Sequence, residues 1–176
     1  MKRKNRNSIL NFKKKGNAIT DSLVFVVLVF GFIIFSLVGN YIFNEINDDI
    51  QADTEINDTI KVKVQNLNTR YPSFMDGLFI FFFILMWVLV LVSSWNIDSH
   101  PVFFIVTVVI LIFVFIVGGE LGNVYEELTS EGDLATMAAG FPMANWVMTH
   151  FLIVIVVIGF SITIVLFGKS QGWFNG

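Results

Sequence analysis

Four long apolar runs constrain the fold of this chain more than any other feature of its sequence. They cover residues 22–43, 77–95, 101–119 and 146–168, and none contains Asp, Glu, Lys or Arg. A membrane has a hydrocarbon core about 30 Å thick, which an α-helix of roughly 20 residues can cross. The strands of a membrane barrel would alternate apolar and polar residues, and these runs do not. The sequence therefore predicts an all-α membrane protein with four transmembrane helices.

The composition of the whole chain agrees with a membrane location. Of the 176 residues, 55% are hydrophobic and 14% are charged, and the mean hydropathy is +0.74. A soluble domain usually has about a quarter of its residues charged. The predicted membrane domain covers residues 22–168. Most of the charged residues lie either in a basic tail before it, residues 1–21, or in two acidic loops between its helices, residues 44–76 and 120–145. Residues 169–176 form a short C-terminal tail.

Basic residues predict the side of the membrane on which each segment lies. The N-terminal tail carries most of them, namely Lys2, Arg3, Lys4, Arg6, Lys13, Lys14 and Lys15. Lysine and arginine near membrane ends favour the cytoplasmic side. Because an even number of crossings brings both termini to one side, we expect both in the cytoplasm. The acidic loops, including Asp76, are expected on the opposite side.

The residues around Gly16, KKKGNAITDS, raise the question of whether the first run is removed as a leader. A secretory signal has an apolar core of 7–15 residues and a small-residue cleavage site, whereas this run is longer and ends in NYIFNEINDD. The lysines, Gly16 and Asp21 are similar to a type IV prepilin leader. Asn17 and the three further apolar runs depart from that pattern. We expect an uncleaved membrane anchor.

The two loops are expected to carry short elements of their own. The first should extend its preceding helix through Ile46 and Ile50, and its segment IKVKV alternates like a short strand. The second is typical of two short interfacial helices broken at Gly132. Each of the three prolines, Pro72, Pro101 and Pro142, is expected at the start of a helix, where a missing N–H costs little.

Residue types that carry chemistry are scarce in this sequence. The apolar runs contain no ionisable residue at mid-bilayer, where such groups are the usual mark of function. His100 and His150 are expected near opposite faces of the membrane, so they cannot share a haem or a metal ion. There is no cysteine for thiol chemistry, and no phosphate-binding or dinucleotide motif. We therefore expect a non-enzymatic protein, with no catalytic, cofactor-binding or metal-binding residues.

Small and polar residues inside the runs predict where helices pack closely. Glycine allows two helix backbones to approach, and a polar side chain can hydrogen-bond across a helix interface. The residues assigned to helix packing, within the protein or between copies of it, are Gly31, Gly39, Asn40, Gly118, Gly159 and His150. His150 could alternatively pair with Glu120 or Glu126 and respond to pH, since imidazole titrates in the physiological range. The favoured interpretation is a polar interfacial residue bonded to a neighbouring helix.

The basic tail is the remaining candidate for binding. Basic residues near a membrane surface attract anionic headgroups at about 1 kcal/mol each. An acidic protein or, without sequence specificity, a nucleic acid would be attracted in the same way. We expect the lipid bilayer and its anionic headgroups to be partners, with the tail also available to a protein.

Three segments together resemble a known family. They are KKKGNAITDSLVFVV, WNIDSHPVFFIVTVVILIFVFIVGGELGNVYEEL and FPMANWVMTH, and they cover most of the chain. They resemble small integral membrane proteins of tailless icosahedral phages that carry an internal membrane. The resemblance implies a structural protein of the viral vesicle beneath the capsid, present in multiple copies and linking the bilayer to capsid proteins or neighbours. A holin-type pore or small channel, and an accessory subunit of a host membrane complex, are the alternatives.

Overall fold

The computed structural model describes residues 18–95 and 101–170, and this part of the chain is almost entirely helical. It forms six helices: α1 (Ala18–Ala52), α2 (Asp58–Trp95), α3 (Pro101–Ser130), α4 (Gly132–Ala139), α5 (Pro142–Thr149) and α6 (Phe151–Ser170). Among the described residues, α1, α2, α3 and α6 are long and apolar enough to cross a membrane. The predicted all-α membrane architecture is confirmed.

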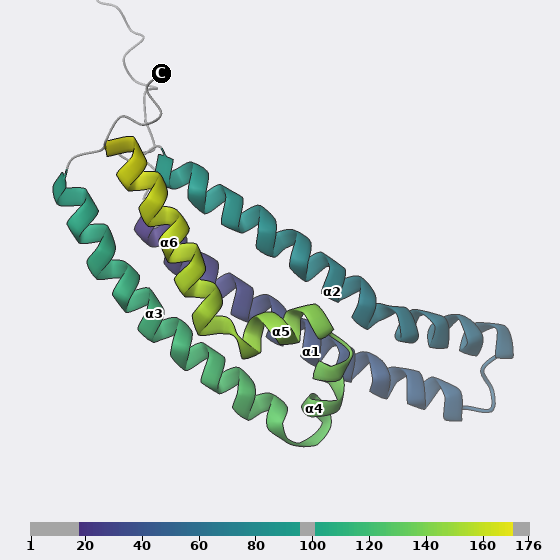
Figure 1. Cartoon of the computed structure of the whole chain (residues 1–176). Helices are drawn as coiled ribbons and strands as arrows, with labels where there is room; N and C mark the ends of the chain where they lie inside the picture. The colour runs from purple at the N-terminus through teal and green to yellow at the C-terminus, as the bar shows by residue number, and fades with distance from the viewer. Residues whose placement is uncertain (1–17, 96–100, 171–176) are drawn as a thin grey trace, which may run out of the picture.

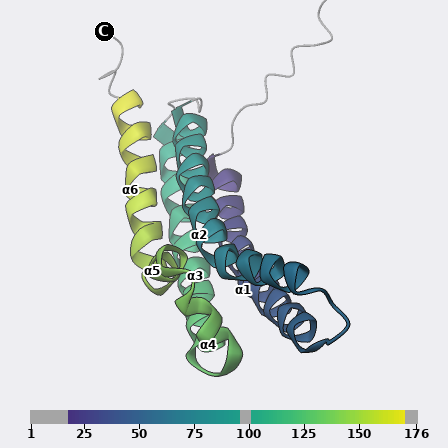
Figure 2. The same cartoon turned by 90° about the vertical axis from the view of Figure 1, so that its right-hand side faces the viewer.

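The four long helices run side by side as a bundle (Figures 1 and 2). α1 packs mainly on α2 and α3 mainly on α6, while α6 also contacts α2 and α1 contacts α3. The core between them is apolar and includes Phe25, Ile33, Val114, Ile155 and Ile162. In a membrane the outer faces of these helices lie against lipid, which explains why many large apolar side chains are exposed outside this core.

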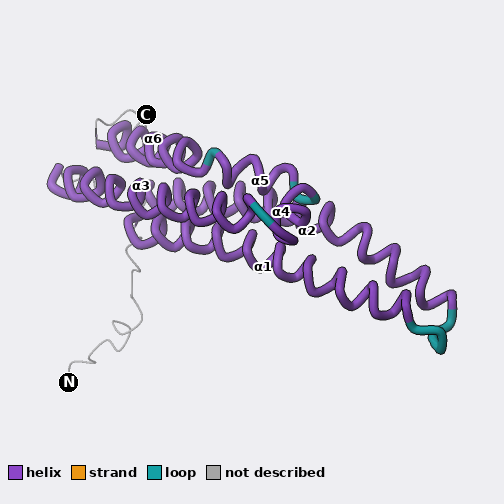
Figure 3. Tube along the Cα trace, turned by 90° about the horizontal axis from the view of Figure 1, so that it is seen from below, coloured by secondary structure: helices purple, strands orange, loops and turns teal. Residues whose placement is uncertain are grey.

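α1 and α2 continue well beyond the part that a bilayer can cover. At about 1.5 Å per residue, their 35 and 38 residues span about 50 Å and 57 Å, against a hydrocarbon core of about 30 Å. Their far ends pair and extend past the other helices (Figures 1 and 3). We call this pair, residues 44–76, the projecting hairpin. The predicted extension of α1 through Ile46 and Ile50 is confirmed.

The predicted strand at IKVKV is wrong, because these residues form the first turns of α2. The Oδ1 atom of Asn57 accepts a hydrogen bond of 2.8 Å from the Thr59 amide, which satisfies one of the free amides at the helix start. Gln51 and Lys61 then join the two helices reciprocally. The side-chain Nε2 of Gln51 donates to the backbone carbonyl of Lys61 at 3.0 Å. In return, Lys61 Nζ donates to the backbone carbonyl of Gln51 at 2.9 Å. Capping and pairing outweigh the strand preference of the β-branched residues.

The prediction that Pro72 starts a helix is wrong. Pro72 lies inside α2. A proline there removes one backbone hydrogen bond and its ring displaces the preceding turn, which bends a helix. Figure 1 shows the change of direction between the membrane part of α2 and the projecting hairpin. Pro101 and Pro142 do stand at the first positions of α3 and α5, as predicted.

The second loop and the fourth span differ from expectation in their boundaries. The break at Gly132 is present, with a φ of 72° that glycine adopts without strain. Residues 120–130, however, continue α3 instead of forming a separate helix. The span predicted as one helix over 146–168 is divided at His150 into α5 and α6. Lys169 lies in the last turn of α6, where its Nζ donates to the Trp95 carbonyl at 2.6 Å.

Candidate functional site

A set of buried and partly buried polar contacts lies at the base of the projecting hairpin, where five helices meet. Its members come from α1, α2, α3, α4 and α5 in turn: Asn40, Asp76, Tyr125, Met137 and Asn145. We call this set the polar junction. It fixes the short helices α4 and α5 to the long helices, and it therefore determines how the hairpin is held on the bundle.

Asp76 of α2 caps the N-terminus of α5. Its carboxylate accepts hydrogen bonds from the amides of Met143 and Ala144, at 3.1 Å and 2.8 Å. The residue before the helix, Phe141, has no side chain that can cap it, and Pro142 at the first position has no N–H. Asp76 is only 5% exposed. It thus supplies, from another helix, the acceptor that the start of α5 lacks, and its charge suits the positive end of the helix dipole.

Tyr125 attaches α3 to the same short helix. Its side chain is fully buried, and its hydroxyl donates to Asn145 Oδ1 at 3.0 Å. A buried tyrosine normally finds a partner for its hydroxyl, because an unpaired one would lose its hydrogen bond to water. α5 is therefore held at its first turns by α2 and by α3.

Asn40 and Asn44 of α1 hold α4. Their Nδ2 atoms donate to the sulfur of Met137 at 3.1 Å and 3.0 Å. Asn40 is 4% exposed, and its Oδ1 atom has no partner among the described residues. The prediction that Asn40 bonds to another helix is confirmed. The thioether is a weak acceptor, so these contacts position α4 more than they stabilise it.

The turn between α4 and α5 fits against the bend of α2. A Cβ atom placed on Gly140 would lie 3.1 Å from Pro72 Cβ and 3.2 Å from the Met137 carbonyl. Contacts this short force the neighbours apart, and neither a proline ring nor a backbone carbonyl can move freely. Glycine at position 140 lets the turn approach the α2 bend.

The predicted packing glycines differ in what they contact. Gly118 of α3 receives the Ile155 side chain of α6, and Gly159 of α6 receives the Phe115 ring of α3, which a Cβ there would approach to 2.9 Å. On Gly39 a Cβ would lie 2.5 Å from the Tyr71 hydroxyl. These three glycines therefore allow close side-chain packing between helices, as predicted.

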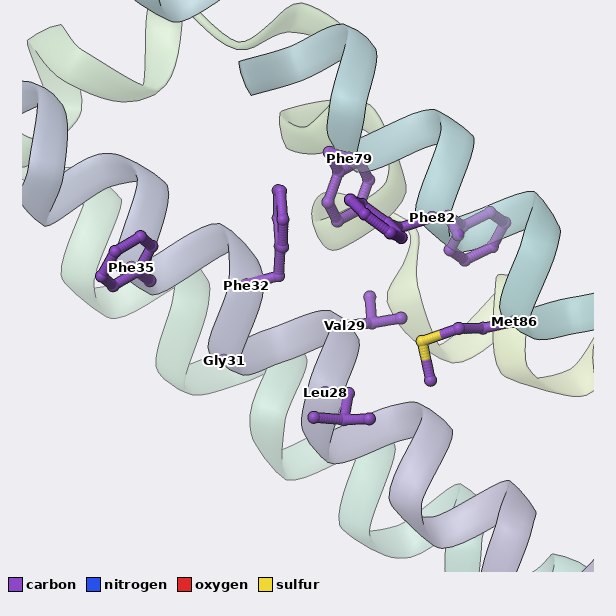
Figure 4. Close-up of a pocket in the computed structure, with 9 residues that line it drawn as sticks. Leu28, Val29, Gly31, Phe32, Phe35, Phe79, Phe82 and Met86 are labelled. Carbon is purple, nitrogen blue, oxygen red and sulfur yellow. The ribbon is translucent and has the colours of Figure 1, made fainter.

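Gly31 has a different surrounding. No atom lies within 4 Å of its Cβ position, so it approaches no neighbouring helix in this chain. It lines an open groove of about 380 Å³ between α1 and α2, together with Leu28, Phe32, Phe35 and Phe82 (Figure 4). Gly31 therefore approaches no other helix among the described residues, and packing between copies stays the prediction for it.

His150 is exposed at the break between α5 and α6. Its ring stacks on Trp146 with centroids 5.0 Å apart, and its Nδ1 atom lies 2.9 Å from the Trp146 carbonyl. Because a carbonyl only accepts, Nδ1 carries the proton in this contact. The predicted bond to a neighbouring helix is wrong, since His150 is bonded within its own segment.

Three of the spaces between the helices are apolar, whereas a fourth, of about 390 Å³ between α3 and the break that separates α5 from α6, also has Glu120, Asn123 and Glu126 in its lining. The groove at Gly31 and a cleft of about 740 Å³ between α2, α5 and α6 are lined by aliphatic and aromatic side chains. The space between α1, α3 and α6 is nearly filled, at about 10 Å³, by residues such as Phe25, Leu111 and Ile158. Within residues 18–95 and 101–170, no group of three or more His, Asp or Glu side chains could hold a metal ion.

Seven of the predicted binding residues, Lys2, Arg3, Lys4, Arg6, Lys13, Lys14 and Lys15, lie outside the described residues, as does His100. Comparison with protein families, with curated proteins and with solved structures finds no match for the chain.

Sequence reasoning missed the role of Asp76, which it placed with the acidic residues of an exposed loop. One signal was present in the sequence FPMAN. A helix that starts at Pro142 without Ser, Thr, Asp or Asn before it has uncapped amides, and these need an acceptor from elsewhere in the fold. Nothing in the sequence identified Asp76 as that acceptor among the other acidic residues.

Proposed function

We propose that this protein has a structural role: it anchors a rigid helical hairpin in a bilayer and links that bilayer to a protein layer. The observation that supports the anchoring part of this role is the continuity of α1 and α2 from the membrane into the projecting hairpin, with the polar junction at its base. A helix without a break transmits position and force, whereas a flexible loop does not. The proposed role is therefore to hold the hairpin in a fixed position relative to the membrane.

The apolar interior favours this role over a pore or small channel. A conducting path requires polar groups or a hydrated lumen along its length. Three of the spaces between the helices are instead lined by apolar side chains, the one between α1, α3 and α6 is nearly closed, and the acidic lining at Glu120 and Glu126 lies beyond the apolar run of α3. Along the described part of the spans, these apolar spaces supply none of the polar lining that an ion path needs.

The protein layer that we propose is the capsid of a phage with an internal membrane, in agreement with the resemblance of the three sequence segments. The basic tail would lie on the cytoplasmic side, together with the C-terminus. Because α1 crosses the bilayer once between the tail and residue 44, the hairpin would lie on the other side. The tail would contact anionic headgroups and acidic capsid surfaces, and the hairpin would contact neighbouring membrane proteins.

Vesicles that contain the purified full-length protein and an entrapped dye test the structural role against the pore. A structural protein leaves the dye inside at every protein-to-lipid ratio that preserves vesicle size. Matched vesicles with an added pore-forming peptide serve as the positive control. Dye release that rises with the amount of inserted protein would replace the structural role with the pore.

A further inference from the structure

The projecting hairpin carries an apolar stripe where α2 has left the membrane. Ile60, Val64, Leu67, Tyr71 and Phe74 follow one another at alternating spacings of four and three residues, which places them along one side of a helix. Val64 and Tyr71 are partly buried, and Tyr71 stacks on Phe43 of α1. Ile60, Leu67 and Phe74 are 52%, 61% and 64% exposed.

α1 carries a matching stripe. Phe35, Ile42 and Ile46 are spaced by seven and four residues, so they lie within about 40° of one another around the helix, and they are 70%, 51% and 46% exposed. Phe35 also lines the groove at Gly31, and Figure 4 shows it one turn along α1 from Gly31. The apolar surface therefore continues from the membrane groove to the hairpin.

Lipid can cover only the membrane part of this surface. Measured along α2, Leu67 lies about 15 Å, and Ile60 about 25 Å, before Gly77, where the apolar run of α2 begins, and the bend at Pro72 makes their heights above the membrane somewhat smaller than these lengths. The headgroup region adds only about 5–8 Å to each side of the hydrocarbon core. These two side chains are thus beyond the reach of acyl chains, and a protein surface is what can remove them from water.

Charges beside the two stripes indicate which protein surface fits. On α1, Glu45 and Asp49 each follow a stripe residue by three positions, and on α2 Lys63 and Arg70 do the same. All four side chains are exposed. Within the described chain, none of them takes part in an ion pair. One edge of the surface is therefore acidic and the other basic.

The two edges also lie at the same height. Gln51 is opposite Lys61, and Phe43 stacks on Tyr71 across the hairpin. Counting along both helices from these contacts puts Ile46 level with Leu67 and Asp49 level with Lys63. A two-fold axis along the projecting hairpin would preserve these heights and would place α1 of one copy against α2 of the other. Each acidic edge would then face a basic edge.

We propose that this surface, formed by Phe35, Ile42 and Ile46 of α1 with Ile60, Leu67 and Phe74 of α2, binds the same surface of a second copy of the chain. The pairing buries the apolar stripes outside the membrane and covers the groove at Gly31 within it. It deepens the proposed structural role, on which it rests, by naming how copies join.

Cross-linking tests this pairing directly, because the chain contains no cysteine. Two full-length proteins with different tags, Ile46→Cys and Leu67→Cys, are produced together in membranes and oxidised. We expect a cross-linked species that carries both tags. The matched control pairs Ile46→Cys with Asn66→Cys, since Asn66 is exposed but lies about 100° around α2 from Leu67. Equal cross-linking in both combinations would overturn the pairing.

Charge exchange provides a second readout. Lys63→Glu with Arg70→Glu should weaken self-association about tenfold, because two acidic edges then meet. Adding Glu45→Lys and Asp49→Lys to the same chain should restore it. Monomer content is measured in detergent at several protein concentrations, and circular dichroism checks that each variant stays helical. A fourfold variant that associates no better than the twofold one would contradict the proposal.

The outcomes separate this inference from the structural role. If the protein is monomeric and the vesicles keep their dye, the proposed pairing is wrong and the structural role is retained. The same conclusion holds if another protein occupies the surface. A paired protein that releases dye keeps the interface and removes the structural role.

Discussion

The carboxylate of Asp76 accepts a hydrogen bond of 2.8 Å from the backbone amide of Ala144, although the two residues belong to helices that are far apart in the sequence. A second bond, from Met143, completes the cap of α5. This contact joins the hairpin helix α2 to the segment that leads into the last span. Within the polar junction, it is the contact between α2 and α5.

Replacing Asp76 by alanine should lower the free energy of unfolding by about 1–3 kcal/mol, because two amides at the start of α5 lose their acceptor in a buried place. Asp76→Asn keeps one acceptor oxygen and should cost less. Thermal unfolding in detergent, followed by circular dichroism, measures both. Glu127→Ala is the matched control, since Glu127 is an exposed acid on α3. Equal stability of Asp76→Ala and Glu127→Ala would contradict the capping role.

Gly140→Ala should also destabilise the protein, by about 1–3 kcal/mol, because its Cβ would press on Pro72 and on the Met137 carbonyl. Gly77→Ala is the control, since no atom lies within 4 Å of its Cβ position inside α2. Alanine is the better helix former there, so Gly77→Ala should leave stability unchanged or raise it by about 0.5–1 kcal/mol. The same unfolding measurement compares the two. A Gly140→Ala variant as stable as Gly77→Ala would mean that the turn does not need glycine.

Gly159→Ala should loosen the packing of α6 on α3, since a Cβ there would lie 2.9 Å from the Phe115 ring. We expect a loss of about 1–3 kcal/mol. Phe115→Leu removes part of that ring, so the double variant should lose less than the sum of the two single variants. A double-mutant cycle on unfolding free energies gives the coupling. Additive losses would show that the two residues do not press on each other.

The proposed topology predicts where single cysteines react from outside the cell. Cysteine at Ser130, in the last turn of α3, should label with a membrane-impermeant maleimide in intact cells. Cysteine at Ser8 or Ser170 should label only after permeabilisation, because both termini are expected in the cytoplasm. Labelling at position 8 in intact cells would reverse the orientation.

The proposed tail contact predicts a salt-dependent attachment to the capsid. Exchange of Lys13, Lys14 and Lys15 for glutamine should leave membrane insertion intact, because Lys2, Arg3, Lys4 and Arg6 remain to set the orientation. Individual exposed ion pairs contribute about 0–1 kcal/mol, so many copies are needed, and salt screens them. Particles are dissociated across a salt series, and the protein is followed to the vesicle or the shell. Identical partitioning of variant and parent at every salt concentration would rule out tethering by these lysines.

Several features could be predicted from the residues because they depend on near neighbours in the chain. The apolar runs, the continuation of α1 through Ile50 and the break at Gly132 are of this kind. The strand expected at IKVKV was wrong because local preference for extended structure is weak, and the pairing of Lys61 with Gln51 favours a helix. Pro72 was expected at a helix start but lies inside α2. The helix continues through the proline because contacts of α2 with α1 offset the one backbone hydrogen bond that the proline removes.

The sequence by itself determined that the four long helices belong in a lipid bilayer. The free energy of transferring a helix into a membrane is a sum over consecutive side chains and is nearly independent of tertiary contacts. The tertiary structure decided what the loops do. Whether Asp76 faces water or caps α5, whether Gly31 packs or stays open, and whether the last span is broken at His150 depend on atoms from distant parts of the chain. Hydrogen bonds and close contacts act over a few ångströms, so only the folded arrangement specifies them.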